Sequence, residues 1–530
     1  MPDHVFPVAI VGGGPVGLLS ALLLARSGVE CVLVERHANV INHPKAMSLT
    51  GRTMEIFRSL GLESAIKSGA LDMQDRALAI WSRSLVGEEW GIIPLPRGAD
   101  GKPANGATHC PQTITEQALL AALEKEPLAS ILFDHEVMAF SEHDNGIVRI
   151  SVRRPASIVP VEFRCRYLIG ADGAASPIRR GLQIQAEGPG DQGHFLNIFF
   201  RAAYGKHLHK RRAVLYQVLD EGRFEAFVAV NGDDLWLMHH FLMPGESPSD
   251  FDDERLQNMI REASGLPHEP VEILGASPWV MSPKVAHRFR SGRTFLVGDA
   301  SARLSPTGGL GMNTGLQAAH NLAWKLSSVV RGAPDSLLDS YESERRPVAL
   351  ASFHTADAFR QEVFSTIEAG IEGDFQRVKQ LIAASARAEN PGEQLGVAYE
   401  SGAFIPSDSH ASGRVLPPIR VTDGDQVFPI TYWIGYDWVL IAAGDSAHWQ
   451  AAAESARTHL GPLIVRQIGG LDGVGDVDGA FLESFCLRPG GAVLVRPDGF
   501  VAWVCREHPN SPTEALHAAI NQLLGTPCEG

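Results

Sequence analysis

The chain has 530 residues, of which 45% are hydrophobic and 20% are charged, and this length suffices for two to four domains with substantial cores. Its formal net charge of −15 argues against non-specific binding to nucleic acid or to an anionic membrane. The six cysteines are scattered without CxxC or paired spacing, which argues against a disulfide framework and favours a reducing cytoplasm. The histidine pairs lack neighbouring cysteine or carboxylate ligands, so we predict no metal site.

The first motif spans residues 8–36, VAIVGGGPVGLLSALLLARSGVECVLVER, and predicts a strand, a tight turn, a helix and a second strand. Gly12, Gly14 and Gly17 occupy the glycine positions of GxGxxG, and Glu35 ends the second strand. The first glycine permits the turn, the second lets a pyrophosphate approach the backbone, and the third lets the helix pack on the strand. The acid suits a ribose diol, so this segment predicts a dinucleotide site.

The same segment contains an uncharged stretch, residues 8–25, that is nearly as long as a membrane span. Three glycines and Pro15 interrupt it, and the preceding MPDHVFP lacks the positive cluster of a secretory signal. We therefore expect neither a targeting segment nor a transmembrane segment.

The second motif, GADGAASPIRR, follows a predicted strand over residues 167–169. It places Asp172 and Gly173 at the end of a strand, where Ser176 and Pro177 can open a helix. A carboxylate at a strand end that is followed by a helix start favours contact with a phosphate or a hydroxyl group of a ligand.

Between the second and third motifs lie the apolar runs LNIFF, RAVLYQVL, RFEAFVAV and DLWLMHHFLM, separated by residues typical of turns. Runs of this length that are rich in aromatic and β-branched residues predict antiparallel strands.

The third motif begins with a short strand over residues 293–297 and continues as GDASARLSPTGGLGMN. Asp299 stands at the strand end, and Pro306, Gly309 and Gly311 precede a helix whose first turn holds Met312 and Asn313. Backbone amides at a helix start are free donors, and glycines allow a flat ligand to approach them closely. Three such sites spread over about 300 residues predict one large ligand that touches all of them.

Composition changes twice in the last third of the chain. Residues 334–388 are helical in pattern, whereas residues 389–425 are rich in Gly, Pro and Ser and predict a linker. After the linker, strands such as DWVLIAAG and GAVLVRPDGFVAWV alternate with helical stretches, which predicts a small α/β domain. It contains no CxxC, so we expect packing or dimer contact there instead of redox activity.

The three motifs, in this order over residues 5–350, resemble the class A flavoprotein monooxygenases, the family of para-hydroxybenzoate hydroxylase and phenol hydroxylase. The resemblance implies an α/β (α+β) fold: a Rossmann-like FAD-binding domain with an inserted antiparallel-sheet substrate domain. The phrase VRPDGFVAW resembles the thioredoxin-like C-terminal domain of phenol hydroxylase relatives. The expected domain limits are 1–185 and 281–388 for FAD binding, 186–280 for the substrate sheet, 389–425 for the linker and 426–530 for the C-terminal domain.

The resemblance also implies the residues that contact FAD. They are Gly12, Gly14, Pro15, Gly17, Glu35, Arg36, Lys45, Arg52, Gln112, Asp172, Asp299, Gly309, Gly311, Met312 and Asn313. Two departures from the family pattern affect the details of flavin motion and nicotinamide handling. Lys45 stands where relatives often have arginine, and Ala302 replaces a common histidine.

The implied reaction takes its chemistry from the cofactor. NADPH or NADH would reduce the flavin, O2 would form a C4a-hydroperoxide, and a phenolic ring would attack its distal oxygen. The protein must exclude water and draw away the phenolic proton, so a polar group of the sheet should face the substrate. Tyr216, His239, His240 and Arg201 are the candidates, and Pro306 belongs to the active-site loop by resemblance.

The expected partners are a small aromatic substrate, NAD(P)H and O2, with no nucleic acid and no membrane, and a homodimer is possible. Simple phenols, chlorophenols, hydroxylated acids and polycyclic polyketides all stay open as substrates, with few basic residues on the sheet favouring a neutral one. Two alternatives also stay open. One is an FAD-dependent oxidoreductase of the same fold that inserts no oxygen, and the other is a degenerate flavin-binding scaffold.

Overall fold

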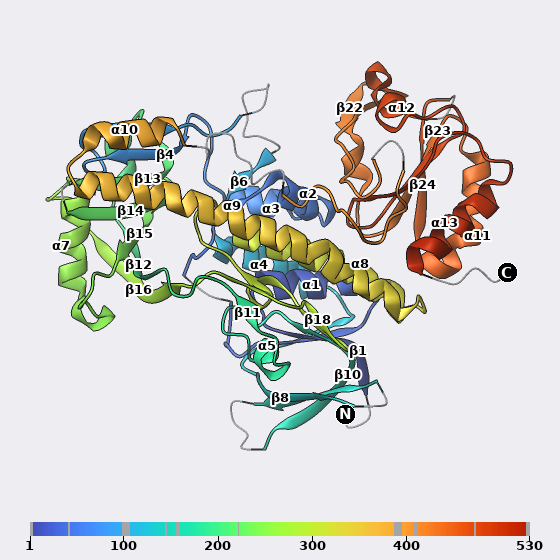
Figure 1. The fold of residues 1–530 in the computed structure, drawn as a ribbon, viewed down its shortest axis with the longest axis horizontal. Coiled ribbons are helices and arrows are strands. Elements are labelled where there is room, and N and C mark those ends of the chain that lie inside the picture. Colours follow the sequence, from blue (N-terminus) through green and yellow to red (C-terminus); the bar gives the residue numbers. More distant parts are fainter. Residues whose placement is uncertain are drawn as a thin grey trace.

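The computed structural model describes residues 4–40, 43–97, 106–143, 146–154, 159–220, 222–385, 395–407, 411–470 and 473–525. Two large sheets lie side by side, and a smaller C-terminal unit stands next to them (Figure 1). A long helix, α9 (Asp339–Ile371), runs across both large sheets. Within the described ranges, no helix combines the length and apolar character needed to cross a membrane.

The first sheet has eight strands and a parallel centre in the order β18-β19-β10-β1-β2-β7, extended by β9 and β8 beside β10. Its strands are β1 (Val5–Val11), β2 (Cys31–Val34), β7 (Ala129–Leu132), β8 (Glu136–Glu142), β9 (Val148–Arg153), β10 (Val161–Gly170), β18 (Arg290–Ser291) and β19 (Thr294–Leu296). The central strands are apolar on both faces because helices cover the sheet. This is the Rossmann-like arrangement that the first motif predicts.

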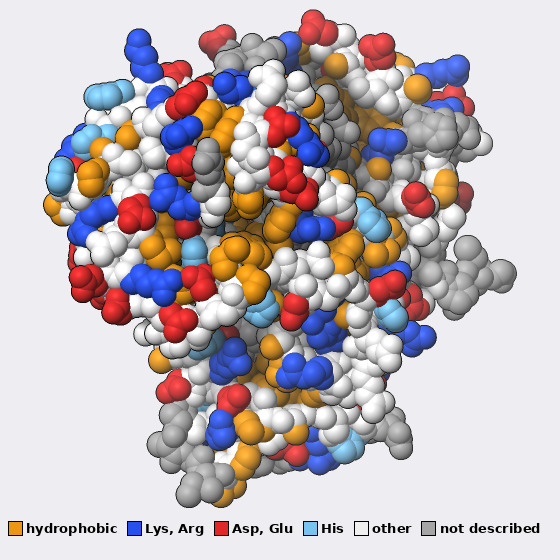
Figure 2. Space-filling model, turned by 60° about the vertical axis from the view of Figure 1, so that its left-hand side comes forward, with side chains coloured by type: hydrophobic (Ala, Val, Ile, Leu, Met, Phe, Trp, Pro, Cys, Tyr) orange, Lys and Arg blue, Asp and Glu red, His pale blue; other side chains and the backbone are white. Residues whose placement is uncertain are grey.

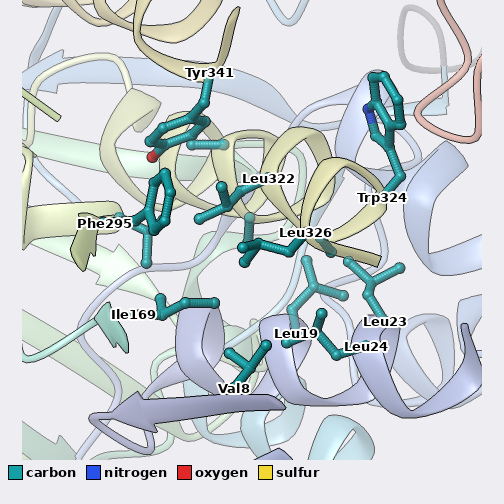
Figure 3. Packing of buried hydrophobic residues seen from close by; sticks show 14 of the residues in the cluster. Val8, Leu19, Leu23, Leu24, Ile169, Phe295, Leu322, Trp324, Leu326 and Tyr341 are labelled. Carbon is teal, nitrogen blue, oxygen red and sulfur yellow. The ribbon is translucent and has the colours of Figure 1, made fainter. Parts of the chain in front are cut away.

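The helices around this sheet are α1 (Pro15–Arg26), α2 (Gly51–Ser59), α3 (Glu63–Ser68), α4 (Gln112–Leu123), α5 (Pro177–Gly181) and α8 (Leu310–Val330). Helix α1 packs against both α4 and α8. Figure 3 shows this core, in which Leu19 and Leu23 of α1 lie near Leu326 of α8. Helix α1 can begin directly after the turn because Pro15 fits the first helical position, whose amide would have no intrahelical partner.

The second sheet has seven strands in the order β16-β12-β15-β14-β13-β4-β5. The strands are β4 (Ala77–Ser82), β5 (Glu89–Ile93), β12 (Gly193–Arg201), β13 (Ala213–Asp220), β14 (Arg223–Ala229), β15 (Leu235–Phe241) and β16 (Glu272–Met281). All neighbours are antiparallel except β13 and β4. Helix α7 (Asp253–Ser264) packs on one face, and α6 (Gly205–Leu208) follows β12. The four apolar runs identified in the sequence form β12 to β15, as predicted.

Strands β4 and β5 come from residues 77–93, so the sheet is wider than the expected segment 186–280. Helix α10 (Phe375–Ala383) packs against β5, and Trp90 of β5 stacks on Phe375 at 4.3 Å. The sequence pattern missed these strands because they lie far from the rest of the sheet along the chain. The domain limits themselves stay a prediction.

Smaller elements join these layers. The paired strands are β3 (Ser48–Leu49) with β6 (Thr108–His109), and β11 (Ala186–Glu187), β17 (Lys284–Ala286) and β20 (Ala302–Arg303) in one small sheet. The short helical turns are η2 (Pro248–Asp250), η3 (Gly298–Ala300), η4 (Asp335–Leu338), η7 (Ile430–Trp433) and η8 (Val477–Gly479).

The C-terminal unit is built on a mixed four-stranded sheet in the order β24-β23-β26-β27. Its elements are β21 (Arg420–Asp423), β22 (Gln426–Pro429), β23 (Trp438–Ala443), α11 (Ala447–Leu460), β24 (Leu463–Ile468), β25 (Gly475–Asp476), α12 (Ala480–Phe485), β26 (Ala492–Val495), β27 (Val501–Cys505) and α13 (Pro512–Leu524). Helices α11 and α13 cover one face and α12 covers the other, which fits the expected thioredoxin-like domain. Trp438 packs edge-on against Trp324 of α8 at 5.3 Å, so its core is continuous with that of the first sheet.

A buried charge network fixes this unit to the long helices. Glu344 of α9 accepts hydrogen bonds from Arg496 at 2.7 and 2.9 Å and from Lys325 at 2.7 Å. Arg496 also pairs with Asp498, and the charged groups of Glu344, Arg496 and Lys325 are inaccessible to solvent. Burial alone would raise the pKa of Glu344, but Arg496 and Lys325 hold it at about 2. The carboxylate therefore stays charged inside the protein.

We expect replacement of Arg496 by methionine to lower the free energy of unfolding by about 3–5 kcal/mol, since Glu344 and Asp498 would stay buried without their main partner. Urea unfolding at pH 7 measures the loss. In the parent protein, the contribution of Glu344 is complete above its unfolded pKa of 4.5 and is lost as the pH falls towards 2.

Arg488→Met is the matched control, because Arg488 forms an exposed ion pair with Glu507. An equal effect of the two substitutions on unfolding would contradict a stabilising role for the buried network.

Candidate functional site

The first two motifs and the loop of the third border one cavity of about 1540 Å³. It extends from the carboxyl ends of β1, β2 and β10 to one face of the seven-stranded sheet, and α9 forms part of its wall. On the face of the molecule in Figure 2, hydrophobic side chains gather around a central hollow. The carboxyl ends of parallel strands are the usual ligand-binding edge of such sheets.

The glycines of the first motif have different roles in the turn. Gly12 has φ +110°, and a Cβ atom there would lie 2.2 Å from the carbonyl oxygen of Ala171. A Cβ at Gly17 would lie 1.9 Å from the carbonyl oxygen of Gly12. A Cβ at Gly14 would meet no described atom within 4 Å. Gly12 and Gly17 therefore allow the backbones to touch, whereas Gly14 faces the cavity and leaves room for a ligand.

Two carboxylates at strand ends have part of their hydrogen-bonding capacity occupied by nearby backbone. Glu35, after β2, accepts the backbone N–H of Gly13 at 2.6 Å. Asp172, after β10, accepts the hydroxyl of Ser176 at 2.6 Å and the N–H of Ile178 at 2.8 Å. Burial raises the pKa of Asp172, while these hydrogen bonds oppose the shift. Both side chains border the cavity, and their remaining lone pairs can accept ligand hydroxyls.

Asp299 follows β19 and faces the cavity with its carboxylate. The surrounding protein raises its pKa, and the cations Arg303 and Lys45 oppose that shift. Gly309, with φ +67°, begins helix α8 in the left-handed region, where a Cβ would lie 2.7 Å from Cβ of Ser48. The loop can therefore lie tightly against the start of β3, and Gly311 stays open to a ligand.

Asn313 holds this loop in place through hydrogen bonds on the side away from the cavity. Its side chain donates to the carbonyl oxygens of Ser48 at 2.9 Å and Gly309 at 2.7 Å, and it accepts from the N–H of Thr50 at 2.9 Å. The side chain is buried and does not border the cavity. It ties the first turn of α8 to the segment that joins β3 and α2.

The structure brings most residues of the sequence prediction together around the cavity. Those that border it are Gly12, Gly14, Pro15, Glu35, Arg36, Lys45, Gln112, Asp172, His239, His240, Asp299, Pro306, Gly309, Gly311 and Met312. Clear space at Gly14 and Gly311, beside carboxylates at three strand ends, fits FAD, the cofactor that the sequence resemblance implies. Gly17 and Asn313 support the site from outside the cavity.

The structure places Arg52 away from the cavity, although the sequence resemblance implies contact with FAD. Instead of bordering the cavity, it donates to Glu55 at 2.6 Å and to the backbone carbonyl of Asp498 in the C-terminal unit. Its guanidinium also lies over the ring of Phe500. The second residue of α2 points towards the neighbouring unit, which a local motif cannot show.

The prediction that Tyr216 and Arg201 face the substrate is also corrected, because neither residue borders the cavity. Tyr216 lies on the opposite face of β13, where its hydroxyl donates to the carbonyl of Arg211 and its ring contacts Trp236. Arg201 is exposed at the end of β12 and pairs with Asp234. Side chains alternate between the two faces of a strand, and Tyr216 occupies the face away from the cavity. Arg201 shares the face of Asn197 but lies beyond the cavity, at the end of the strand.

Both neighbouring histidines of β15 border the cavity, but their ring nitrogens have different partners. The Nδ1 of His239 is buried with no hydrogen-bond partner among the described residues. The Nδ1 of His240 lies 2.8 Å from Glu225, and its Nε2 lies 3.4 Å from Glu246. Burial would lower the pKa of His240, but the two carboxylates raise it. His239 therefore has a ring nitrogen available to a ligand, whereas both ring nitrogens of His240 already face carboxylates.

Sequence reasoning identified His239 but missed the other members of a set of residues that cross the sheet opposite the cofactor motifs. Strand pairing aligns one residue from each of five strands, and we call this set the polar row: Ser277, Asn197, His239, Ala226 and Gln217. All five border the cavity, and the amide oxygens of Asn197 and Gln217 are buried without a hydrogen-bond partner in the described structure. The alternation of LNIFF and LYQVL could have indicated these positions, but the register could not be read from sequence.

An aromatic wall runs beside the polar row. The ring of Phe195 stacks on Trp279 at 4.6 Å and meets Phe241 edge-on at 5.2 Å. Phe364 of α9 contacts Phe241 from the other side of the cavity at 6.4 Å. Aromatic faces next to unpartnered polar atoms can bind a flat ring system that carries oxygen substituents.

Comparison with known proteins agrees with this geometry. A family profile described as FAD binding domain matches residues 5–356, and one described as Aromatic-ring hydroxylase, C-terminal, matches residues 409–527. The chain is 34% identical to the tetracenomycin A2 monooxygenase-dioxygenase of Streptomyces glaucescens, over 99% of each chain.

Two solved structures are similar over nearly their whole length. The flavin-dependent monooxygenase PieE, in complex with FAD and substrate, is 29% identical with a TM-score of 0.89, covering 99% of this chain and all of that one. Aklavinone-11 hydroxylase, in a ternary complex with FAD and aklavinone, is 28% identical with a TM-score of 0.84 and the same coverage.

The glycine geometry predicts opposite outcomes for two alanine substitutions. Gly14→Ala should leave the unfolding midpoint of the FAD-free protein unchanged but weaken FAD binding by about tenfold or more, because its Cβ points into free space in the cavity. Gly17→Ala should destabilise the fold itself by about 1–3 kcal/mol, because its Cβ meets backbone. Thermal unfolding and quenching of flavin fluorescence measure the two effects, and identical behaviour of the two variants would refute the assignment.

Proposed function

We propose that this chain, which belongs to the FAD-dependent aromatic-ring hydroxylases, hydroxylates a neutral polycyclic phenol with NAD(P)H and O2. Membership of the family sets the reaction class, which is oxygen insertion into an aromatic ring. The polar row supports the choice of substrate. NAD(P)H and O2 as cosubstrates, assembly as a homodimer and a cytoplasmic location are parts of the same proposal.

When bound, FAD supplies the oxygen-inserting chemistry, and the chain supplies binding and orientation. Gly14 and Glu35 would hold its adenosine diphosphate part, and Asp299 would accept hydroxyls of its ribityl chain. Backbone at Gly311 and Met312 would meet the edge of its ring. These roles follow the family pattern onto residues that border the cavity.

The length of the polar row favours a large substrate. Adjacent strands lie about 4.8 Å apart, so His239 and Gln217, which are two strands apart, are separated by about 10 Å along the sheet. Ala226 stands between them and leaves space where a larger side chain would fill the cavity. A single ring cannot contact both His239 and Gln217 at once, whereas a fused-ring system with an oxygen at each end can.

Charge and shape support the same class. The polar row contains amides, a hydroxyl and an imidazole but no lysine or arginine, so it has no partner for a substrate carboxylate. The aromatic wall of Phe195, Trp279 and Phe241 offers flat apolar surface beside it. Aklavinone-11 hydroxylase, which has the same fold, binds FAD and aklavinone in one complex, and this supports a site that accommodates both a cofactor and a second ligand.

A substrate panel tests the proposal on the intact, FAD-loaded protein. We expect a neutral polycyclic phenol to stimulate NAD(P)H oxidation and O2 uptake and to give a product heavier by one oxygen atom. Single-ring phenols should bind weakly, because they cannot reach both ends of the row. Tight coupling with single-ring phenols alone would refute the substrate class, and hydrogen peroxide as the only product with every compound would favour an oxidoreductase without oxygen insertion.

Gln217→Leu tests the far end of the row. This change keeps side-chain volume but removes the buried amide, so we expect KM for a polycyclic phenol to rise about tenfold while kcat changes little. Gln257→Leu on α7 is the matched control, since Gln257 does not border the cavity. Equal KM values for the two variants would contradict contact between Gln217 and substrate.

A further inference from the structure

We propose that His239 and His43 form a proton path out of the cavity, in which His239 contacts the substrate hydroxyl and His43 acts through His239. This inference rests on the proposed function, because it concerns the proton that a phenol must lose before its ring becomes a strong nucleophile. It assigns a role to His43, which no cofactor motif includes.

His239 is the one titratable member of the polar row. Ser277, Asn197 and Gln217 offer hydroxyl or amide groups, which do not accept a proton near neutral pH. The ring of His239 borders the cavity, while its Nδ1 is buried and has no hydrogen-bond partner in the described chain. One side of the ring can thus meet the substrate while the other faces protein.

His43 borders the same cavity as this row. Its ring is close to the backbone carbonyl of Asn197, the residue paired with His239 across the strands. It meets the ring of Phe199 at 5.8 Å, and the missing side chain at Gly275 leaves room beside it. The two imidazoles therefore occupy the same corner of the cavity, on separate elements.

Local hydrogen bonding prepares His43 to accept a proton. Its Nδ1 lies 3.1 Å from the carbonyl oxygen of Pro44, and a carbonyl can only accept, so Nδ1 carries the hydrogen in the neutral ring. Its Nε2 then has a free lone pair, and this atom is buried without a hydrogen-bond partner among the described residues. Once protonated, the ring would have carbonyl oxygens of Pro44 and Asn197 nearby as acceptors.

Burial is the main reason why both rings are neutral at rest, and neighbouring charges add to its effect. Burial lowers the pKa of His239 to about 4, and His43 adds to that shift. Burial and Lys45 lower the pKa of His43, while the two backbone carbonyls oppose the change. Lys45 and the two histidines are the titratable groups in these contacts, and no carboxylate takes part. A neutral ring can receive a proton, whereas a charged ring cannot.

The transfer of the phenolic proton through His239 to His43 requires no further reactant. The O–H bond of the substrate breaks, and its proton forms an N–H bond on the cavity side of His239. The opposite ring nitrogen of His239 releases its own proton to the lone pair at Nε2 of His43, directly or through a water molecule. His239 ends neutral, the substrate ends as a phenolate, and His43 carries the proton until it passes to solvent.

The test compares His239→Gln, His43→Gln and His207→Gln in the FAD-loaded enzyme with a polycyclic phenol that the parent enzyme hydroxylates. His207 is the control because it pairs with Glu269 at 2.9 Å and does not border the cavity. We expect kcat for hydroxylation at pH 7 to fall about 100-fold for His239→Gln and about tenfold for His43→Gln, with KM little changed. His207→Gln should match the parent.

The pH profile separates a proton path from a packing role. The parent rate should be nearly flat from pH 6 to 9, whereas both variants should gain activity as the pH approaches the pKa of the phenol, because the substrate then ionises in solution. Added imidazole should rescue His43→Gln in part. Variants with a parent-like pH profile, or with an equal loss at every pH, would overturn the proposal.

The outcomes also separate this inference from the proposed function. If the parent enzyme hydroxylates no polycyclic phenol, the substrate assignment fails first. If the parent hydroxylates such a phenol and both variants keep its rate, the substrate class stands and the proton path fails.

Discussion

The close approach of two strand ends is the constraint on which the whole site depends. A Cβ at position 12 would lie 2.2 Å from the carbonyl oxygen of Ala171, so the end of β1 can meet the end of β10 only if residue 12 is glycine. Together with the parallel pairing of β2, β1, β10 and β19, this contact brings Glu35, Asp172 and Asp299 to one edge of the first sheet, although Glu35 and Asp299 are 264 residues apart along the chain. This edge of the first sheet forms the wall of the cavity that lies opposite the second sheet.

The two halves of the cavity have different physical origins. The cofactor side is built from backbone turns and strand ends, which tolerate little variation because glycine conformation and close contacts fix them. The substrate side is the flat face of a sheet, where each side chain can change without moving the backbone. One reaction can therefore be kept while the polar row and the aromatic wall are altered for another substrate.

The sequence allowed prediction of those parts of the site whose residues lie close together along the chain. The glycine turn, the carboxylates at strand ends and the first turn of α8 could be predicted, since each depends on residues a few positions apart. The polar row could not, because Gln217 and His239 meet the same cavity only through the register of β13, β14 and β15. Tyr216 was misassigned for the same reason: one step along β13 turns a side chain to the opposite face. Arg52 was misassigned because its partner lies 446 residues away.

The buried network around Glu344 also has a consequence for how the protein is made. Glu344 is inaccessible to solvent, and its partner Arg496 comes 152 residues later in the chain. As the chain emerges from the ribosome, Lys325 of α8 is made before Glu344, but Arg496, its second cationic partner, is made much later. The buried network of the cofactor half is therefore completed during synthesis only when the turn after β26 has appeared. The last strands of the chain close the first domain to be made.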